Sequence, residues 1–263
     1  MRPLVMGVLN VTPDSFADGG RYFDPEKALA RGLEMVAEGA DVVDVGGESS
    51  RPGAEPVAAA EEHRRVVPVI EALTPHVRVS VDTRKASVAE AAVAAGATLV
   101  NDISASLWPV AADHGVGWVA MHMRGTPTTM QDDPRYGDVV AEVRPFLRRR
   151  AREAIDGGVA EVWVDPGIGF GKTAAHNLSL LHHLPELVDD GFPVLVGTSR
   201  KSFLGRLSAG PDGPAAPVAQ RLAGSLATAT WAMAAGAAMV RVHDVGATVQ
   251  AATLVGAPEG SDR

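Results

Sequence analysis

Short apolar runs recur eight times along the chain, and each of them ends on a small set of polar residues. The runs cover residues 4–11, 41–47, 78–83, 99–103, 118–123, 161–167, 193–199 and 239–245. Adjacent apolar residues such as Val42-Val43 and Leu99-Val100 are typical of strands that are buried on both faces of a parallel sheet. The pattern therefore predicts eight parallel strands whose polar residues gather at the strand ends.

Apolar residues recur at helical spacing in most of the intervals between these runs. Pro25 suits the first helical position with Asp24 as N-cap, and Gly39 is expected to end that helix. We expect helices over residues 25–38, 58–73, 85–95, 136–155, 175–188, 218–235 and 247–255. Residues 104–115 have room for only about two helical turns, so we expect a truncated fourth helix there.

Alternation of strands and helices in a chain of 263 residues predicts one (β/α)8 TIM barrel, an α/β fold that needs roughly 250 residues. We assign residues 1–257 to this single domain and expect residues 258–263 to form a flexible tail. A hydrophobic content of 46% suffices for one large core.

Composition excludes several classes of function. The chain has no cysteine, which excludes disulfide frameworks, thiolate metal sites and cysteine nucleophiles. A formal net charge of -8 argues against a nucleic acid or a membrane surface held by bulk electrostatics. The sequence has no run of about 18 apolar residues, the length of a membrane-spanning helix. We therefore expect a soluble, cytoplasmic protein that acts on small molecules.

In a (β/α)8 barrel, the loops at the carboxyl ends of the strands build the active site. Polar residues that fall at those ends are expected to share one pocket, and they are Asn10, Asp82, Asn101, Asp165, Lys201, Arg241 and His243. Carboxylates and amides can hydrogen-bond a flat heterocycle with several ring nitrogens. Donors for a phosphate are offered by Ser50, Arg51, Arg241 and His243. These residues predict a phosphorylated, nitrogen-rich small molecule as the ligand.

Short motifs occur along the chain in a defined order. They are MGVLNVTPDSF at 6–16, DVGGESSRPG at 44–53, SVDT at 80–83, NDI at 101–103, DPG at 165–167, GFGKT at 169–173, SRKS at 199–202 and RVHD at 241–244. Together they resemble the bacterial dihydropteroate synthases, a pterin-binding family of TIM barrels, and the resemblance extends from residue 4 to about residue 255.

That family condenses 6-hydroxymethyl-7,8-dihydropterin pyrophosphate with 4-aminobenzoate, which gives 7,8-dihydropteroate and pyrophosphate in folate biosynthesis. The resemblance implies this transferase activity, an Mg²⁺ cofactor, a homodimer and competition by sulfonamides. It also implies that pyrophosphate is lost first, with Asp82 stabilising the pterin cation that forms.

The resemblance further implies three subsites. The pterin would contact Asp82, Asn101, Ile103, Met121, Asp165, Lys201 and Arg241. The pyrophosphate would contact Asn10, Ser50, Arg51, Arg241 and His243, with Asn10 as the Mg²⁺ ligand. The aminobenzoate would lie beside Asp14, Phe16, Pro52, Phe170, Lys201 and Ser202. Catalysis would depend on Asn10, Asp82, Lys201 and Arg241.

Other interpretations stay open at this point. Asp82 could cap a strand end, His122 could be a satisfied core histidine, and Asp102 could be an acceptor of local hydrogen bonds. A methyltetrahydrofolate-binding methyltransferase relative would have no reason to keep residues 49–52 and 199–202. A catalytically silent paralogue would be expected to lose some pterin or pyrophosphate residues, and none is visibly lost.

Two phosphate-binding patterns are excluded. Residues 169–173 do not form a Walker A loop, because Pro166 stands where its first glycine is required. Lys172 and Thr173 are therefore expected to shape a loop near the site. An aldolase-type barrel would need a Schiff-base lysine inside a strand, and no predicted strand interior contains one.

Overall fold

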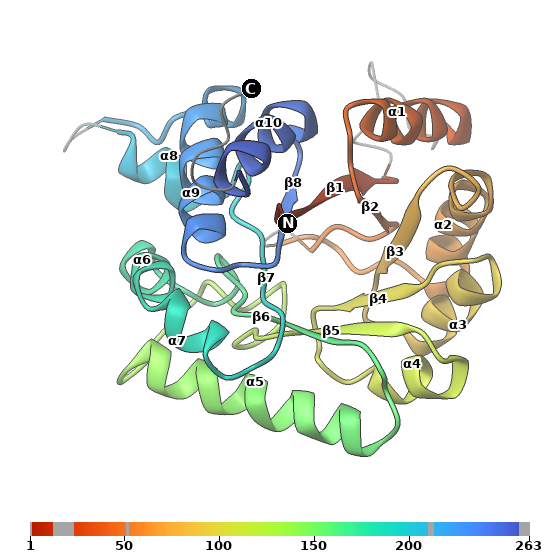
Figure 1. Cartoon of the computed structure of the whole chain (residues 1–263), viewed down its shortest axis with the longest axis horizontal. Coiled ribbons are helices and arrows are strands. Elements are labelled where there is room, and N and C mark those ends of the chain that lie inside the picture. Colours follow the sequence, from red (N-terminus) through yellow and green to blue (C-terminus); the bar gives the residue numbers. More distant parts are fainter. Residues whose placement is uncertain (1, 13–23, 51–52, 210–212, 258–263) are drawn as a thin grey trace.

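The computed structural model describes residues 2–12, 24–50, 53–209 and 213–257. Its sheet contains eight parallel strands in the order β6-β5-β4-β3-β2-β1-β8-β7 (Figure 1). They are β1 Leu4–Asn10, β2 Val42–Gly46, β3 Arg78–Asp82, β4 Leu99–Asp102, β5 Gly117–Met121, β6 Val162–Asp165, β7 Leu195–Val196 and β8 Met239–Val242. A parallel bridge between Val164 and Val194 joins β6 to β7 and closes the barrel. The predicted (β/α)8 fold is confirmed.

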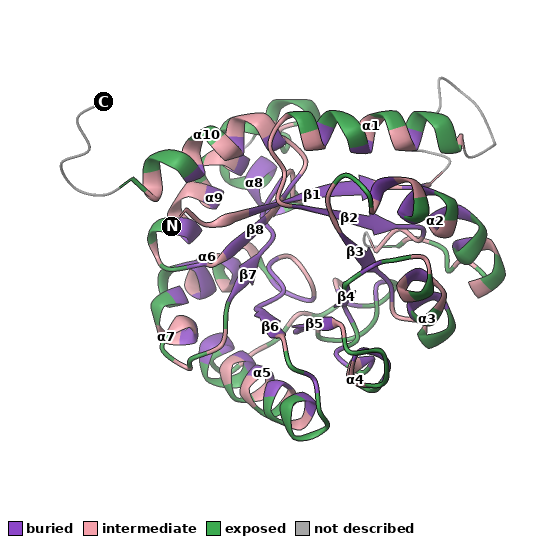
Figure 2. Cartoon of the chain, turned by 45° about the vertical axis from the view of Figure 1, so that its right-hand side comes forward, coloured by how far each residue is buried: buried purple, intermediate pink, exposed green. Residues whose placement is uncertain are grey.

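Helices surround the barrel and turn their buried faces toward it (Figure 2). They are α1 Pro25–Ala37, α2 Ala59–Leu73, α3 Ala86–Ala94, α4 Trp108–His114, α5 Val139–Asp156, α6 Ala174–His182, α7 Leu184–Val188, α8 Ser202–Leu207, α9 Leu222–Ala234 and α10 Val245–Val255. The predictions over 25–38, 58–73, 85–95 and 247–255 agree within two residues at each end, and α4 is as short as expected. Among the described residues, no helix has both the length and the apolar character that crossing a membrane requires.

Local sequence determines where α1 begins and ends. The Asp24 carboxylate accepts hydrogen bonds from the backbone N–H groups of Glu26 at 3.1 Å and Lys27 at 3.2 Å. These bonds satisfy two donors that a helix start leaves without a partner. Gly39 follows the helix with φ of +95°, a conformation that glycine adopts without a steric penalty.

Two predicted helices differ from the structure for identifiable reasons. The helix expected over 136–155 begins at Val139, because the Asp138 side chain caps it by accepting hydrogen bonds from two backbone N–H groups. The helix expected over 175–188 is two helices, α6 and α7. Pro185 has no N–H to donate to the preceding turn, so it lies in the first turn of a new helix.

The chain after β6 differs most from its prediction. Of the strand expected over 193–199, only Leu195–Val196 is regular strand, and the helix expected over 218–235 is a 3₁₀ turn at Val218–Gln220 followed by α9. Helix α8 was not predicted, because its six residues are too few to show helical periodicity.

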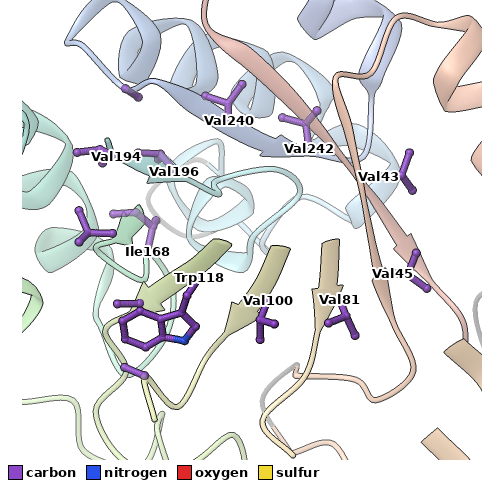
Figure 3. Packing of buried hydrophobic residues seen from close by; sticks show 14 of the residues in the cluster. Val43, Val45, Val81, Val100, Trp118, Ile168, Val194, Val196, Val240 and Val242 are labelled. Atoms are coloured by element: carbon purple, nitrogen blue, oxygen red, sulfur yellow. The ribbon is translucent and has the colours of Figure 1, made fainter. Parts of the chain in front are cut away.

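Two apolar clusters lie on the two sides of the strands. The outer cluster packs the strands against the helices, and Figure 3 labels Val43, Val45, Val81, Val100, Val240 and Val242 among its members. The inner cluster fills the barrel with Met6, Val42, Leu99, Val119, Trp163, Leu195 and Met239. Successive side chains of a strand point to opposite faces, so the residue two positions beyond each inner residue also points into the barrel. Five of those seven next inward positions hold Asp44, Asn101, Met121, Asp165 and Arg241, and the other two hold Val8 and Gly197.

An ion pair closes the opposite end of the barrel, where the strands begin. Arg78 donates to Glu161 through Nη1 at 2.9 Å and through Nη2 at 2.7 Å. Trp163 Nε1 donates to the same carboxylate at 2.7 Å. Burial raises the pKa of Glu161, but the hydrogen bonds from Arg78 and Trp163 lower it by more, so its pKa lies below the ordinary value of 4.5. Polar residues at this face stabilise the fold, as expected for a barrel.

Candidate active site

Inward-facing side chains of neighbouring strands form a polar layer at the carboxyl ends of the barrel. Its members are Asp44 of β2, Asp82 of β3, Asn101 of β4, Asp165 of β6 and Arg241 of β8. Asp82 and Asn101 are partners in the β3–β4 register, and Met121 is the partner of Asp165 in the β5–β6 register. The carboxylates and Asn101 are buried, and Arg241 is half-buried. Apart from Asp44, the members of this layer were predicted to share one pocket, and the tertiary structure brings them together.

Arg241 links two acids of the polar layer. Its Nε donates to Asp44 Oδ2 at 2.6 Å, and its Nη2 donates to Asp82 Oδ2 at 2.8 Å. Asn101 Nδ2 donates to the same oxygen of Asp44 at 2.9 Å. Because this bond engages the amide nitrogen of Asn101, its amide oxygen is turned away from Asp44 and can accept from a ligand.

Burial sets the charge of Asp82. It raises the pKa of Asp82 to about 7, against an opposing effect of Arg241, and the negative charges of Asp44 and Glu62 raise it further. The pKa of Arg241 is raised, because the two carboxylates outweigh the burial that lowers it. Asp82 therefore changes its charge close to neutral pH beside a permanent cation, and perturbed acids of this kind are common in catalytic sites.

Lys201 reaches from the end of β7 toward β6. Its ammonium donates to the backbone carbonyl of Ile168 and lies 4.7 Å from the centre of the Phe170 ring. The Asp165 carboxylate accepts a hydrogen bond from Gly167 N at 2.7 Å. Burial lowers the pKa of Lys201 to about 8 and raises the pKa of Asp165, while the opposite charge of each opposes the shift of the other. Lys201, Asp165 and Phe170 therefore belong to one part of the site.

Three residues predicted to bind phosphate, Asn10, Ser50 and His243, lie at or just after the ends of β1, β2 and β8. His243 follows β8, and its Nδ1 lies 3.0 Å from Ser199 Oγ, which also accepts from the backbone N–H of His243 at 3.1 Å. Asn10 ends β1, whose neighbours in the sheet are β2 and β8. Ser50 is half-buried in the segment after β2, and Arg51 lies outside the described residues.

Sequence comparison identifies the family. A family model described as pterin binding enzyme matches residues 6–243. The chain belongs to the pterin binding enzyme family. Among its relatives, the dihydropteroate synthase of Mycobacterium leprae (strain TN) is 49% identical over 262 residues, which cover 96% of this chain and 92% of that protein.

Solved structures of pterin binding enzymes agree with this assignment. The dihydropteroate synthase from Xanthomonas albilineans in complex with 7,8-dihydropteroate superposes with a TM-score of 0.84 at 46% identity, over 96% of this chain and 92% of that one. The Yersinia pestis dihydropteroate synthase in its sulfonamide drug complex gives a TM-score of 0.89 at 45% identity, over 97% and 93%. The predicted resemblance to bacterial dihydropteroate synthases is confirmed, and so is the prediction of an enzyme.

Two of the alternative interpretations describe this family member correctly. The His122 ring packs edge-on against Phe146 at 4.9 Å, and burial together with the charge of Lys172 lowers the pKa of His122 to about 3. It is therefore a neutral core histidine. Asp102 is fully buried and accepts hydrogen bonds from the backbone of the segment that follows it and from Trp118 Nε1. His122 and Asp102 therefore stabilise the pocket without belonging to the polar layer.

The remaining predicted pocket residues are placed only in part. Ile103 is buried directly after β4, and Ser202 is the exposed first residue of α8. The predictions for Asp14, Phe16 and Pro52 lie outside the described residues.

One member of the polar layer, Asp44, was not among the predicted site residues. Asp44 is fully buried and accepts hydrogen bonds from both Arg241 and Asn101. Its second oxygen, Oδ1, has no hydrogen-bond partner among the described residues. The available signal was a charged residue between Val43 and Val45 inside an otherwise apolar strand, since an unpaired charge is costly to bury there.

Proposed function

We propose that this protein catalyses the dihydropteroate synthase reaction, in which 6-hydroxymethyl-7,8-dihydropterin pyrophosphate and 4-aminobenzoate give 7,8-dihydropteroate and pyrophosphate. One observation carries the proposal. This pterin binding enzyme is 49% identical to a dihydropteroate synthase. It holds buried acids, an amide and two cations together at the carboxyl ends of its barrel strands. This set can hydrogen-bond the nitrogens of a pterin and balance its charge.

Pterin recognition is assigned to the polar layer. Asp82 and Asp165 offer acceptors to the ring N–H and amino groups, and the amide oxygen of Asn101 adds a further acceptor. Lys201 supplies a donor beside Asp165. Arg241, which Asp44 holds from behind, presents a planar guanidinium that can stack on the ring, a contact for which an ammonium is less suited. Met121 and Ile103 would supply apolar contacts.

The reaction breaks the bond between the pterin methylene carbon and the oxygen of the pyrophosphate. The electron pair of that bond leaves with pyrophosphate, and the lone pair of the arylamine nitrogen then forms the new carbon–nitrogen bond and releases a proton. Ionised Asp82 would stabilise positive charge on the pterin, while Arg241 and His243 would stabilise negative charge on the leaving group. The arylamine is already neutral, so no strong base is required.

Magnesium fits this site as an ion held mainly by the substrate. The described residues contain no group of three or more carboxylate, histidine or cysteine side chains arranged to hold a metal. Asn10, at the end of β1, offers one amide oxygen, and Mg²⁺ commonly takes most of its remaining ligands from substrate phosphates and water. When bound there, the ion would supply charge neutralisation for the departing pyrophosphate.

A homodimer is also proposed. Large apolar side chains are exposed on the last helices, with Leu207 on α8, Leu222 on α9 and Leu254 on α10 between 47% and 78% accessible. Such residues would gain from burial against a second copy. Sedimentation equilibrium tests this, because a monomer at micromolar concentration would contradict it. The cytoplasmic location expected from composition stays a prediction.

Pyrophosphate release from the pterin substrate tests the proposed function. With Mg²⁺ present, release is measured with and without 4-aminobenzoate, and the pterin product is identified by mass. We expect release with formation of dihydropteroate only when the arylamine is present. Tight pterin binding without any release would contradict the proposal and would favour a silent paralogue or a methyl-transfer relative.

A further inference from the structure

Lys172 is a buried cation that the proposed reaction does not use. It lies on the segment between β6 and α6 and is 1% exposed. Its ammonium contacts the backbone carbonyls of Gly167 at 3.0 Å, Phe170 at 3.0 Å and His122 at 3.2 Å, and it lies 3.0 Å from His122 Nδ1. An ammonium has three donors, so these acceptors satisfy it fully and hold it in one place.

These bonds join two strand ends. His122 directly follows β5, whereas Gly167 and Phe170 belong to the β6–α6 loop, residues 166–173. The loop lies directly on the backbone that follows β5, because a Cβ atom on Gly167 would lie 1.9 Å from the His122 carbonyl oxygen and one on Gly171 would lie 2.4 Å from that of Arg124. Both glycines have positive φ, so this chain path is one that other residues rarely adopt.

The β6–α6 loop in turn positions residues of the proposed pterin site. Its Ile168 carbonyl accepts from the Lys201 ammonium, its Phe170 ring lies beneath the same ammonium, and its Gly167 N–H holds the Asp165 carboxylate. Each of these three contacts comes from a residue within five positions of Lys172. A glycine-rich loop has few side chains of its own to hold such contacts in register, and the Lys172 ammonium joins this loop to the backbone that follows β5.

The charge of Lys172 acts in the same direction. It lowers the pKa of Asp165, which burial raises, and so favours the ionised carboxylate. Burial lowers the pKa of Lys172 itself to about 7, and nearby Lys201 lowers it further while Asp165 opposes both effects. An uncharged side chain of equal size at position 172 would therefore remove the hydrogen bonds that hold the loop. It would also change the electrostatic interactions of Lys201 and Asp165.

We propose that Lys172 is a positioning residue for the synthase reaction, which holds the β6–α6 loop so that Lys201 and Asp165 are placed to bind the pterin. The expected change in KM rests on the proposed function. The expected displacement of Lys201 does not depend on that function.

The composition of the chain allows a test that separates charge from volume. Because the natural chain has no cysteine, Lys172→Cys introduces a single thiol. In denaturant, 2-bromoethylamine converts this thiol to an aminoethyl side chain that restores the length and charge of lysine. With 1-bromopropane it becomes a propyl side chain of the same length without the charge. Both products are refolded beside wild type that has passed through the same steps.

Kinetics provide the first readout. We expect the propyl form to raise KM for the pterin substrate at least about tenfold, since small displacements of positioned groups cost one to two orders of magnitude. The aminoethyl form should return KM to near the wild-type value. Arg78→Met, at the opposite end of the barrel, serves as a control that loses stability without touching the loop. Its KM should stay at the wild-type value.

The second readout needs no activity. The chain has only four lysines, at positions 27, 85, 172 and 201, so protein labelled with ¹³C-lysine gives few side-chain NMR signals. Lys201→Arg assigns the signal of Lys201. That signal should move in the propyl form and return in the aminoethyl form. If neither alkylated form refolds, Lys172→Met produced directly in cells is measured in the same two ways.

Each outcome decides the proposal. Equal KM values and equal Lys201 signals in the propyl and aminoethyl forms would overturn it, and so would wild-type behaviour of Lys172→Met. If wild type itself releases no pyrophosphate, the proposed function fails. The Lys201 signal then decides alone whether Lys172 positions that residue.

Discussion

At the scale of single residues, the site depends on how Arg241 is shared between two buried acids. The guanidinium bonds Asp44 and Asp82 at 2.6 and 2.8 Å, so a single positive charge faces two carboxyl groups. Desolvation makes it costly for both acids to be ionised, and the pKa of Asp82 is accordingly raised. A ligand with its own positive charge would favour the ionised form of Asp82. The carboxylate formed in this way would in turn stabilise a pterin cation.

Replacing this acid tests its role. Asp82→Asn keeps the size and the ability to accept a hydrogen bond from Arg241, so the fold should hold. Without a charge to stabilise the cation, kcat should fall by about 10²- to 10³-fold. Arylamine-dependent pyrophosphate release measures the effect, with far-UV circular dichroism as the control for folding. Near-normal turnover would remove Asp82 from the mechanism.

The same residue predicts a pH dependence. With its pKa near 7, Asp82 is protonated below that pH and ionised above it. Since the proposed role needs the carboxylate, kcat/KM should decline as the pH falls through about 7. In Asp82→Asn this acidic decline should disappear from the residual rate. An unchanged acidic decline in the variant would assign it to another group.

At the scale of elements, one buried acid organises the short connection between β4 and α4. Asp102 accepts from Ser104 N at 2.8 Å, from Ser106 N and Leu107 N at 2.6 Å each, and from Trp118 Nε1 at 3.2 Å. Two of these donors, Leu107 N and Trp118 Nε1, would otherwise be buried without a partner. The two-turn α4 can therefore follow β4 after a short turn, and Asn101 stays at its place in the polar layer.

Loss of this acceptor should destabilise the element strongly. Asp102→Ala leaves the buried donors Leu107 N and Trp118 Nε1 unsatisfied, and we expect the free energy of unfolding to fall by about 3 kcal/mol or more. Urea denaturation followed by tryptophan fluorescence measures it. Asp113→Ala, on the exposed face of the same helix, should change stability by less than about 0.5 kcal/mol. Equal effects of the two substitutions would contradict this account.

At the scale of the whole molecule, the two ends of the barrel have separate tasks. The polar layer at the carboxyl ends contains buried acids with raised pKa values, an arrangement that costs stability. The opposite end contains the bidentate Arg78–Glu161 pair, with a carboxyl whose pKa is lowered. Function and stability are therefore expected to respond to different substitutions.

Arg78→Met tests this separation. The pair is partly exposed, with 31% and 40% of its side chains accessible, so its loss should cost only about 1 kcal/mol. Because the pKa of Glu161 is lowered in the folded state, this contribution is fully present above the ordinary value of 4.5. It should be lost as the pH falls below that value. Denaturation at pH 7 and pH 4 measures the difference, and kinetic constants at pH 7 should match wild type.

Inhibition tests the site as a whole. A sulfonamide that mimics 4-aminobenzoate should compete with it and should leave Vmax unchanged at saturating arylamine. Steady-state rates at several concentrations of both compounds distinguish the modes of inhibition. Noncompetitive inhibition would mean that the arylamine pocket does not lie beside Lys201 and Phe170, where the resemblance to the family implies it.

The sequence by itself determined the class of fold and most of the chemistry. Eight apolar runs with helical intervals imply a (β/α)8 barrel, because both faces of each strand must be buried. Polar residues at the ends of those runs can only gather at one mouth, so Asp82, Asn101, Asp165 and Arg241 were predictable as neighbours. Short-range signals also placed the beginning of α1.

The tertiary structure alone decided how these residues are used. Asp44 and Lys172 act through contacts with residues far away in the sequence, since Asp44 and Arg241 differ by 197 in residue number and Lys172 and His122 by 50. Spacing along the chain carries no information about such pairs, because they form only when the barrel closes. The depth of burial that raises the pKa of Asp82 and lowers that of Lys201 likewise exists only in the packed molecule.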